Sequence, residues 1–245
     1  FERPSGGSEA IKEAAKLLSN ADFPVILSGA GVVLADAIND CKALAEKLDS
    51  PVASGYQHND SFPGSHPLAV GPLGYNGSKA AMELISKADV VLALGTRLNP
   101  FSTLPGYGID YWPKDAAIIQ VDINSDRIGL TKKVSVGICG DAKQVAQQLL
   151  NSLSPEAGNK NRDERKALIH QTKSAWLQTL SSMDHEDDDP GTSWNEEARV
   201  RDADRMSPRM AWRAIQNGLP KNAIISSDIG NNCAIGNAYP TFEEG

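Results

Sequence analysis

Short apolar runs alternate with longer amphipathic stretches through the first part of the chain. Apolar residues recur at helical spacing from Ile11 to Leu18, and the continuous run PVIL follows at 24–27 and leads into glycines. A helical stripe predicts an amphipathic helix, and a short apolar run bounded by glycines is typical of a strand covered on both faces. We therefore expect a helix with Ser8 as its N-cap, followed by a buried strand.

This unit of helix and strand repeats. A helical stripe between Leu34 and Leu48 precedes the run PVASG, and three more strands are expected at 89–95, 116–123 and 134–139. Alternation of strands with helices implies right-handed crossovers, which place the strands parallel in one sheet. The pattern predicts an α/β fold with a doubly wound, Rossmann-like parallel sheet of five strands.

The pattern changes after about residue 150, where the sequence becomes polar. One more amphipathic helix, with Trp176 on its apolar stripe, precedes the acidic run at 184–189, which favours a solvated linker. These changes divide the chain into a central Rossmann-like domain at 1–155, a helix and acidic interdomain linker at 156–205, and the truncated start of a second α/β domain at 206–245.

The second domain opens with SPRMAWRAIQNGLP. Ser207 lies at the N-cap position of a new helix, Pro208 at its first helical position and Gly218 where the helix should stop. A buried strand is expected at 223–227, and the polar loop SDIGNN follows it. The amides of this loop could bind a phosphate, or its asparagines could cap a turn, and both interpretations stay open.

Polar side chains follow several expected strands at one edge of the sheet, where ligands bind in open α/β folds. The loop GYQHNDSFPGSHP carries Gln57, His58 and Asn59, and histidine is the natural acid or base near neutral pH. These residues could equally hold the loop through hydrogen bonds, and we favour a structural role for His66. Arg97 follows another strand, where it could meet an anion or form a structural salt bridge.

Glycines after the first strand raise the question of a dinucleotide site. GAGVVL lacks the third glycine of G-x-G-x-x-G, because Leu34 occupies that position, and no acidic residue clearly ends the second strand. We favour a tight turn. No metal site is expected either, because neither the pair His58 and His66 nor the cysteines have the paired spacing of zinc ligands.

Charge and composition narrow the function classes. The 245 residues carry a formal net charge of −7 at pH 7 without a basic cluster, which argues against a nucleic-acid partner. No apolar run approaches the roughly 18 residues of a membrane-spanning helix, so we expect a cytoplasmic protein with no membrane partner. The three cysteines lack C-x-x-C spacing, and Cys41 and Cys139 are expected to be buried thiols because they lie in apolar segments.

Over most of residues 8–150 the chain resembles the central domain of thiamine-diphosphate enzymes of the acetolactate synthase superfamily. The resemblance is carried, in order, by ILSGAGV, PVASGYQHNDSFPGSHPLAVGPLGYNGSKAA, ADVVLALGTRLNPF, IIQVDINSDRIG and GDA. MSPRMAWRAIQNGLPKNAIISSDIGNN resembles the beginning of the diphosphate-binding domain of these enzymes. Both ends of the chain look internal, so we expect a piece of a longer enzyme.

Within this superfamily, YQHND, LGTRLNPFSTLPGYGIDYWP and SSMDHEDDDPGTSW are most similar to acetyltransferases that convert sulfoacetaldehyde and phosphate to acetyl phosphate and sulfite. The resemblance implies thiamine diphosphate and Mg2+ as cofactors, bound mostly by regions outside this chain, in a homodimer or homotetramer. Gly230, Asn231 and Asn232 match the loop that touches the diphosphate. No catalytic or metal-binding residue is expected within residues 1–245, so this chain alone is predicted to be inactive.

Acetolactate synthases also hold a flavin in the central domain. Here RLNPF replaces the RFDDR-like flavin segment and removes two acidic residues, so FAD is not expected. Four residues are then expected to serve mainly the turn geometry of the fold, namely Gly29, Gly31, Asp122 and Asp141.

A sulfonate and a phosphate both need cationic or amide donors. This chemistry makes Gln57, His58, Asn59 and Arg97 the candidates for the approach of substrate to the active site. Two alternatives remain beside the acetyltransferase: an acetolactate synthase-like carboligase or decarboxylase, and a non-catalytic nucleotide-binding scaffold.

Overall fold

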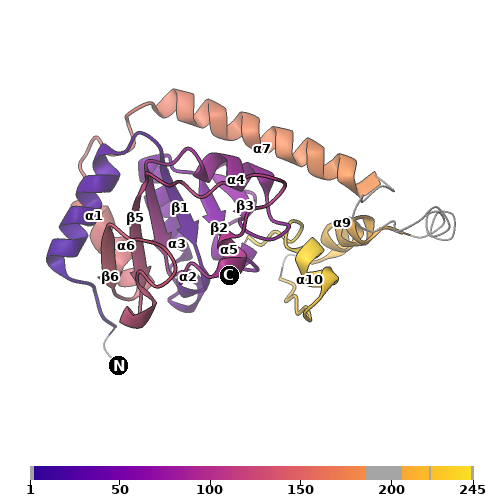
Figure 1. Ribbon diagram of the computed structural model, residues 1–245, viewed down its shortest axis with the longest axis horizontal. Coiled ribbons are helices and arrows are strands. Elements are labelled where there is room, and N and C mark those ends of the chain that lie inside the picture. Colours follow the sequence, from indigo (N-terminus) through magenta and orange to yellow (C-terminus); the bar gives the residue numbers. More distant parts are fainter. Residues whose placement is uncertain (1–2, 186–205, 221, 244–245) are drawn as a thin grey trace.

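A parallel sheet forms the centre of the computed structural model, which describes residues 3–185, 206–220 and 222–243 (Figure 1). The strand order is β3-β2-β1-β4-β5-β6, with every pairing parallel. The strands are β1 Pro24–Ser28, β2 Val52–Ser54, β3 Ala69–Pro72, β4 Val90–Leu94, β5 Ala117–Asp122 and β6 Val136–Cys139. This order is that of a doubly wound nucleotide-binding sheet, and it confirms the predicted fold class.

The central strands are buried from end to end. Every residue of β1 and β4 is buried, and the two strands pair in register from Pro24 with Val90 to Ser28 with Leu94. Apolar runs covered on both faces are typical of parallel sheets, which is why the sequence predicted these strands correctly. The sheet core therefore lies around the β1–β4 pair, where the strand order reverses.

The sixth strand, β3, was not predicted. Its sequence contains Gly71, with a φ of 89°, and Pro72, which cannot donate to a ladder. Both residues favour a turn in a sequence pattern. At the sheet edge they are tolerated, since β3 pairs only with β2 and the register shifts between Val52 and Ala53.

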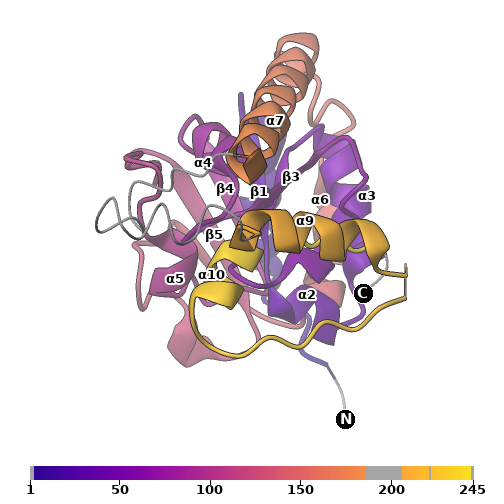
Figure 2. The same cartoon turned by 90° about the vertical axis from the view of Figure 1, so that its right-hand side faces the viewer.

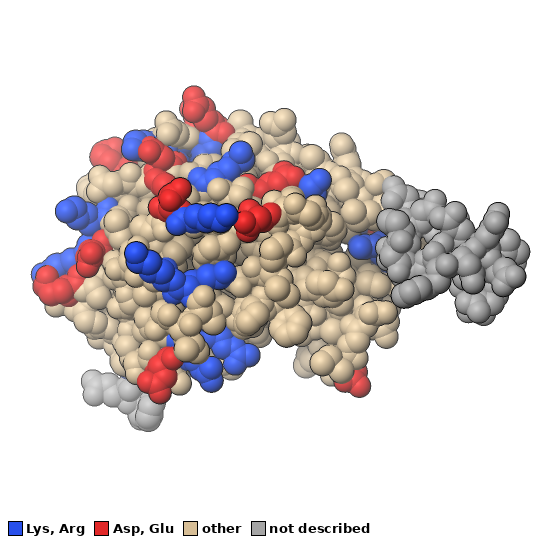
Figure 3. Space-filling view, viewed as in Figure 1, with Lys and Arg blue, Asp and Glu red and all other residues tan. Residues whose placement is uncertain are grey.

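Helices cover both faces of the sheet (Figure 2). On one face α1 packs against α6, which packs against α3; on the other α4 contacts β2, β3 and α7. The helices are α1 Ser8–Asn20, α2 Ala30–Leu34, α3 Ile38–Leu48, α4 Lys79–Ile85, α5 Pro100–Thr103, α6 Ala142–Ser152, α7 Arg162–His185, α9 Pro208–Gly218 and α10 Asn231–Gly236, with 3-10 turns η1 Asn59–Ser61 and η2 Ser125–Arg127. Basic and acidic side chains are intermixed over the face in Figure 3.

Two predicted helix starts can be compared with the structure. Ser207 caps α9 by accepting a hydrogen bond from the Met210 amide, and Pro208 is the first helical residue, as predicted. The start of α1 is one residue off, because Ser8 is already helical and Gly7 occupies the N-cap position.

Two predictions of burial were wrong: the one for Cys139 and the one for a buried strand at 223–227. Cys41 is fully buried, but Cys139 is exposed, since it lies on the edge strand β6, where buried and exposed residues alternate. The segment 223–227 forms no strand, and Ile224 is 97% exposed. A strand needs a neighbour that completes its backbone hydrogen bonds, and no described residue pairs with this segment.

The acidic run also differs from expectation where the structure describes it. Asp184 is not solvated: it lies at the end of α7 and is only 3% exposed. The remainder of the predicted linker, from 186 to 205, lies outside the described residues. The division of the chain into domains at 155 and 205 stays a prediction.

Candidate functional site

The loops after β1 and β4 touch through their backbones at the point where the strand order reverses. The amide of Gly31 donates to the carbonyl oxygen of Gly95 at 2.8 Å, and a Cβ on Gly31 would lie 2.6 Å from the Gly95 Cα. A Cβ on Gly29 would lie 2.7 Å from the same carbonyl oxygen. Gly95 itself has a φ of 62°. These glycines allow the loops after β1 and β4 to touch each other, which is the expected turn-geometry role.

Two acidic residues at the same edge serve the local backbone. Asp122 Oδ1 accepts the amide of Asn124 at 2.9 Å. Asp141 caps α6 by accepting the amides of Lys143 and Gln144, and it forms an ion pair of 3.4 Å with Arg3. Both carboxylates therefore stabilise turns, as the sequence analysis expected.

The loop after β2 meets the end of the described chain. We call residues 228–243 the α10 segment. The backbone amide of Gln57, whose φ is 62°, donates to Oδ1 of Asn237 at 3.0 Å. Asn59 Nδ2 donates to the carbonyl oxygens of Asn237 at 3.0 Å and Pro240 at 2.7 Å. Two of the predicted site residues thus contact the segment that carries the three others.

Tyr56 reinforces this contact. Its hydroxyl lies 3.7 Å from Cys233 Sγ, and its ring stacks on Phe101 with the ring centroids 5.7 Å apart. Burial, together with the neighbouring Cys233, raises the pKa of Tyr56 to about 12. The phenol is therefore neutral at physiological pH and can donate a hydrogen bond.

The other predicted side chains are accessible. The Gln57 side chain and Arg97 are exposed, and neither side chain forms a hydrogen bond or ion pair with a described residue. His58 Nδ1 lies 3.8 Å from Asp60 Oδ1, and both side chains are about two-fifths exposed, at 41% and 37%. No described contact joins Arg97 to the loop after β2.

His66 is structural, as predicted. Its Nδ1 accepts the amide of Leu68 at 3.2 Å, its Nε2 lies 3.3 Å from a Glu46 carboxylate oxygen, and its ring packs edge-on against Phe62. The side chain is 14% exposed. These contacts hold the loop that leads into β3.

The α10 segment exposes a row of donors at its start. Gly230 has a φ of 137°, a conformation that favours glycine, and a Cβ there would meet nothing within 4 Å. Asn231 and Asn232 open α10, are exposed, and their side-chain amides form no hydrogen bond with a described residue. Trp212 Nε1 donates to the carbonyl oxygen of Asn232 at 3.0 Å, which fixes the backbone.

This set of donors fits an anionic oxygen ligand better than a metal. Backbone and side-chain amides can donate to phosphate oxygens, and a free first turn of backbone amides complements negative charge. Among the described residues, no group of three or more His, Cys, Asp or Glu side chains could hold a metal ion. The start of the α10 segment can therefore donate hydrogen bonds to an anionic oxygen ligand.

Several contact residues were missed by sequence reasoning. Asp184 accepts hydrogen bonds from the Tyr239 hydroxyl at 2.6 Å and from Arg213 Nε at 2.7 Å, which ties α7 to α9 and the α10 segment. The sequence carries no signal for Asp184, because it lies in a run of acidic residues. Asn237 carried a usable signal, because it is a single amide within the apolar stretch CAIGNAY.

Comparison with known proteins supplies a family. Residues 11–149 match the family described as "Thiamine pyrophosphate enzyme, central domain". Over the whole chain, the sequence is 80% identical to a probable sulfoacetaldehyde acetyltransferase of Rhizobium meliloti and 76% identical to a sulfoacetaldehyde acetyltransferase of Roseovarius nubinhibens. A probable acetolactate synthase large subunit of Methanocaldococcus jannaschii is 35% identical over 71% of the chain and 27% of its own length.

The chain spans 42% and 41% of the lengths of the first two relatives. None of the described helices is both long and apolar enough to cross a membrane.

Proposed function

This chain belongs to the thiamine pyrophosphate enzymes, and we propose that it is part of an acyltransferase that converts sulfoacetaldehyde and phosphate to acetyl phosphate and sulfite. The observation that carries the proposal is identity of 80% and 76%, over every residue of the chain, to proteins named for acetyl transfer with sulfoacetaldehyde. The relative named acetolactate synthase is far more distant, at 35%. We propose a homodimer or homotetramer in the cytoplasm, on the family resemblance.

Thiamine diphosphate and Mg2+ are the proposed cofactors. When bound, thiamine diphosphate supplies a nucleophilic thiazolium carbon for attack on a carbonyl group. In this chain Gly230, Asn231 and Asn232 would help to hold the diphosphate through their backbone and side-chain amides. Their exposure and free amides support that role. Mg2+ would be held mainly by residues outside 1–245.

The exposed polar side chains would meet the anionic groups of the substrates. We assign the Gln57 amide, His58 and the Arg97 guanidinium to this approach, because sulfonate and phosphate oxygens bind charged and amide donors strongly. Each of these side chains is at least partly exposed. Asn59 differs, since both hydrogens of its amide already face carbonyl oxygens of the α10 segment. Its proposed contribution is to hold that segment in place.

The reaction tests the proposal directly. The full-length polypeptide, supplied with thiamine diphosphate and Mg2+, should release sulfite from sulfoacetaldehyde only when inorganic phosphate is present, and acetyl phosphate should form in equal amount. Omission of phosphate is the matched control. Absence of sulfite release, together with formation of acetolactate from pyruvate, would replace this proposal with the carboligase alternative.

A further inference from the structure

The side-chain amide of Asn237 is buried at the junction between the α10 segment and the sheet loops. Asn237 is 3% exposed. Its Oδ1 accepts a hydrogen bond from the backbone N–H of Gln57 at 3.0 Å. Its Nδ2 donates to the backbone carbonyl oxygens of Tyr75 at 3.3 Å and Leu73 at 3.5 Å. Oxygen and nitrogen of this amide are thus both used, and by two different loops, the one after β2 and the one after β3.

Asn59 also forms hydrogen bonds across this junction, from the loop after β2 to the α10 segment. Its Nδ2 donates to the backbone carbonyl of Asn237 and to that of Pro240. Both partners are carbonyl oxygens, so the orientation of the Asn59 amide is fixed: the nitrogen must face them. Each asparagine therefore bonds across the junction, one from the α10 segment and one from η1.

Apolar contact at this junction includes one cluster, in which Tyr239, Ile235 and Ala238 of the α10 segment pack with Ala80, Trp176 and Leu180. The amphipathic helix α9 contains no buried residue, and Ile229 is 94% exposed. Within α10 only Cys233, Ala234 and Gly236 are buried. Apolar contact is non-directional, whereas hydrogen bonds have preferred directions. The two asparagines are consequently well placed to set the orientation of α10 as well as its attachment.

The proposed diphosphate residues lie on the same short helix. α10 spans only Asn231–Gly236, with Gly230 before it and Asn237 directly after it. At about 1.5 Å of rise per residue, Asn237 is only about 9 Å along the axis from Asn231. Since a helix this short moves as a unit, any tilt at Asn237 is transmitted to Gly230 and Asn231.

We propose that Asn237 and Asn59 are positioning residues, which hold α10 so that Gly230, Asn231 and Asn232 present their amides to the cofactor diphosphate. This inference rests on the proposed function. It assigns no chemistry to either asparagine, because neither amide has a donor left to offer a ligand. It predicts that a substitution that weakens the junction changes the Kd for the cofactor more than it changes kcat.

The test uses the full-length polypeptide and the isosteric substitutions N237D and N59D. Each places a carboxylate oxygen against carbonyl oxygens that now accept hydrogen bonds. The matched control is N20D, because Asn20 is exposed at the end of α1 and its Nδ2 donates to the Lys16 carbonyl at 2.8 Å. We expect the Kd for thiamine diphosphate, measured by calorimetry with Mg2+, to rise at least about tenfold in N237D and to stay unchanged in N20D.

A second readout does not depend on the cofactor. Amide hydrogen exchange at residues 230–236 of the apo protein should accelerate by about tenfold in N237D while exchange in β1 and β4 stays slow. A purely structural defect would accelerate both regions. Equal exchange at 230–236 in wild type and variant would overturn the positioning role, whatever the cofactor does.

The outcomes separate the two proposals. If wild type fails to bind thiamine diphosphate, the proposed function is wrong, and hydrogen exchange alone decides whether the asparagines hold α10. If wild type binds and N237D binds with the same Kd, the positioning inference is wrong and the function stands. Should N237D fail to fold, N59A, which removes donors without adding charge, is subjected to both measurements.

Discussion

The sheet and the α10 segment are held by different means although they meet at the loops after β2 and β3. β1 and β4 are buried at every residue and pair along their full length, whereas Ile224 and Ile229, near the start of the α10 segment, are almost fully exposed. Apolar burial stabilises the sheet without depending on exact direction. Directional amide and carboxylate contacts orient the α10 segment. Burial dominates in the sheet, and directional hydrogen bonds set the orientation of the α10 segment.

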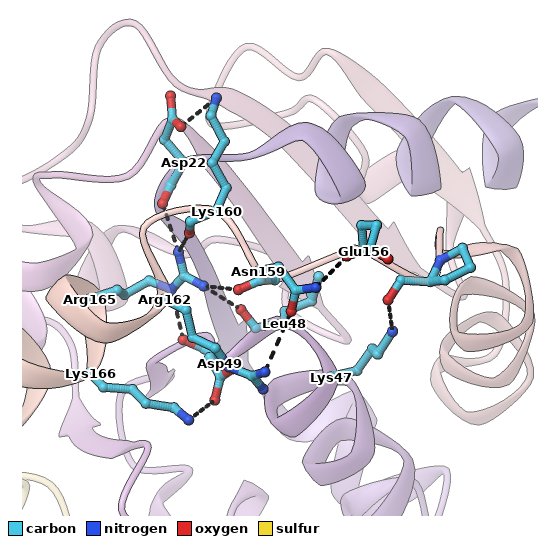
Figure 4. A network of polar contacts seen from close by, with 12 residues as sticks. Asp22, Lys47, Leu48, Asp49, Glu156, Asn159, Lys160, Arg162, Arg165 and Lys166 are labelled. Atoms are coloured by element: carbon cyan, nitrogen blue, oxygen red, sulfur yellow. Dashed lines mark hydrogen bonds and ion pairs between the residues drawn. The ribbon is translucent and has the colours of Figure 1, made fainter.

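Arg165, a single polar residue that packs beside the sheet, shows that polar contacts also stabilise this region. Arg165 at the start of α7 is 1% exposed, and its guanidinium donates to five backbone carbonyl oxygens (Figure 4). The acceptors lie at the end of α3, before β1 and before α7: Leu48, Asp49, Asp22, Gly158 and Lys160. Burial lowers the pKa of Arg165 from its ordinary value. All N–H donors of the side chain are used, so the residue acts as a core element.

The largest expected effect follows from removing this side chain. R165M should destabilise the chain by about 3–5 kcal/mol, because carbonyl oxygens lose their donors in a buried position. Urea unfolding followed by circular dichroism measures the change. The matched control is R162M, whose side chain is 43% exposed and pairs with Asp49 beside Lys166, and it should cost less than about 1 kcal/mol. Equal losses in the two variants would show that burial of the guanidinium contributes nothing special.

A smaller effect is expected from apolar truncation in the sheet. Leu92 is fully buried in the middle of β4, so L92A should cost about 2–4 kcal/mol through lost transfer energy and the cavity left behind. I229S, within the α10 segment, should change stability by less than about 0.5 kcal/mol, because Ile229 is 94% exposed. Both values come from urea unfolding. A loss of more than about 1 kcal/mol in I229S would contradict this difference between the two regions.

Sequence patterns predicted the apolar half of this comparison well. The runs PVIL and DVVLALG correspond to β1 and β4, because strands buried on both faces carry an uninterrupted apolar signal. The same rule missed β3, where Gly71 and Pro72 interrupt the run. It also predicted a buried strand at 223–227, where the described residues provide no neighbouring strand.

The polar contacts that hold the α10 segment were harder to predict from the sequence. Gln57 and Asn59 were selected as candidates, but nothing in the sequence shows that the amide of Asn59 faces Asn237 from across the fold, 178 positions away. Asp184 resembled its acidic neighbours, and only tertiary contact with Tyr239 and Arg213 distinguishes it. Such pairs depend on long-range geometry, for which a single sequence has no periodic signal.

The smallest expected effect is a pH-dependent difference in stability between wild type and a Tyr239 variant. The Tyr239 hydroxyl donates to Asp184 Oδ1 at 2.6 Å, and burial raises its pKa from 10.0 to about 12. Since the folded pKa is the higher one, this stabilisation is fully present below about pH 10 and is lost as pH rises toward about 12. Y239F should therefore be less stable than wild type by about 1 kcal/mol at neutral pH, and the gap should shrink on titration from about pH 10 to about pH 12.

Urea midpoints of wild type and Y239F at matched pH values measure this gap. Other buried tyrosines titrate in both proteins, so their contribution cancels in the difference. The conservative control is Y75F: Tyr75 is 50% exposed, and its difference from wild type should stay near zero across the same range. A gap for Y239F that is constant with pH would mean that Tyr239 titrates alike in the folded and unfolded states, and would overturn the claim that burial raises its pKa.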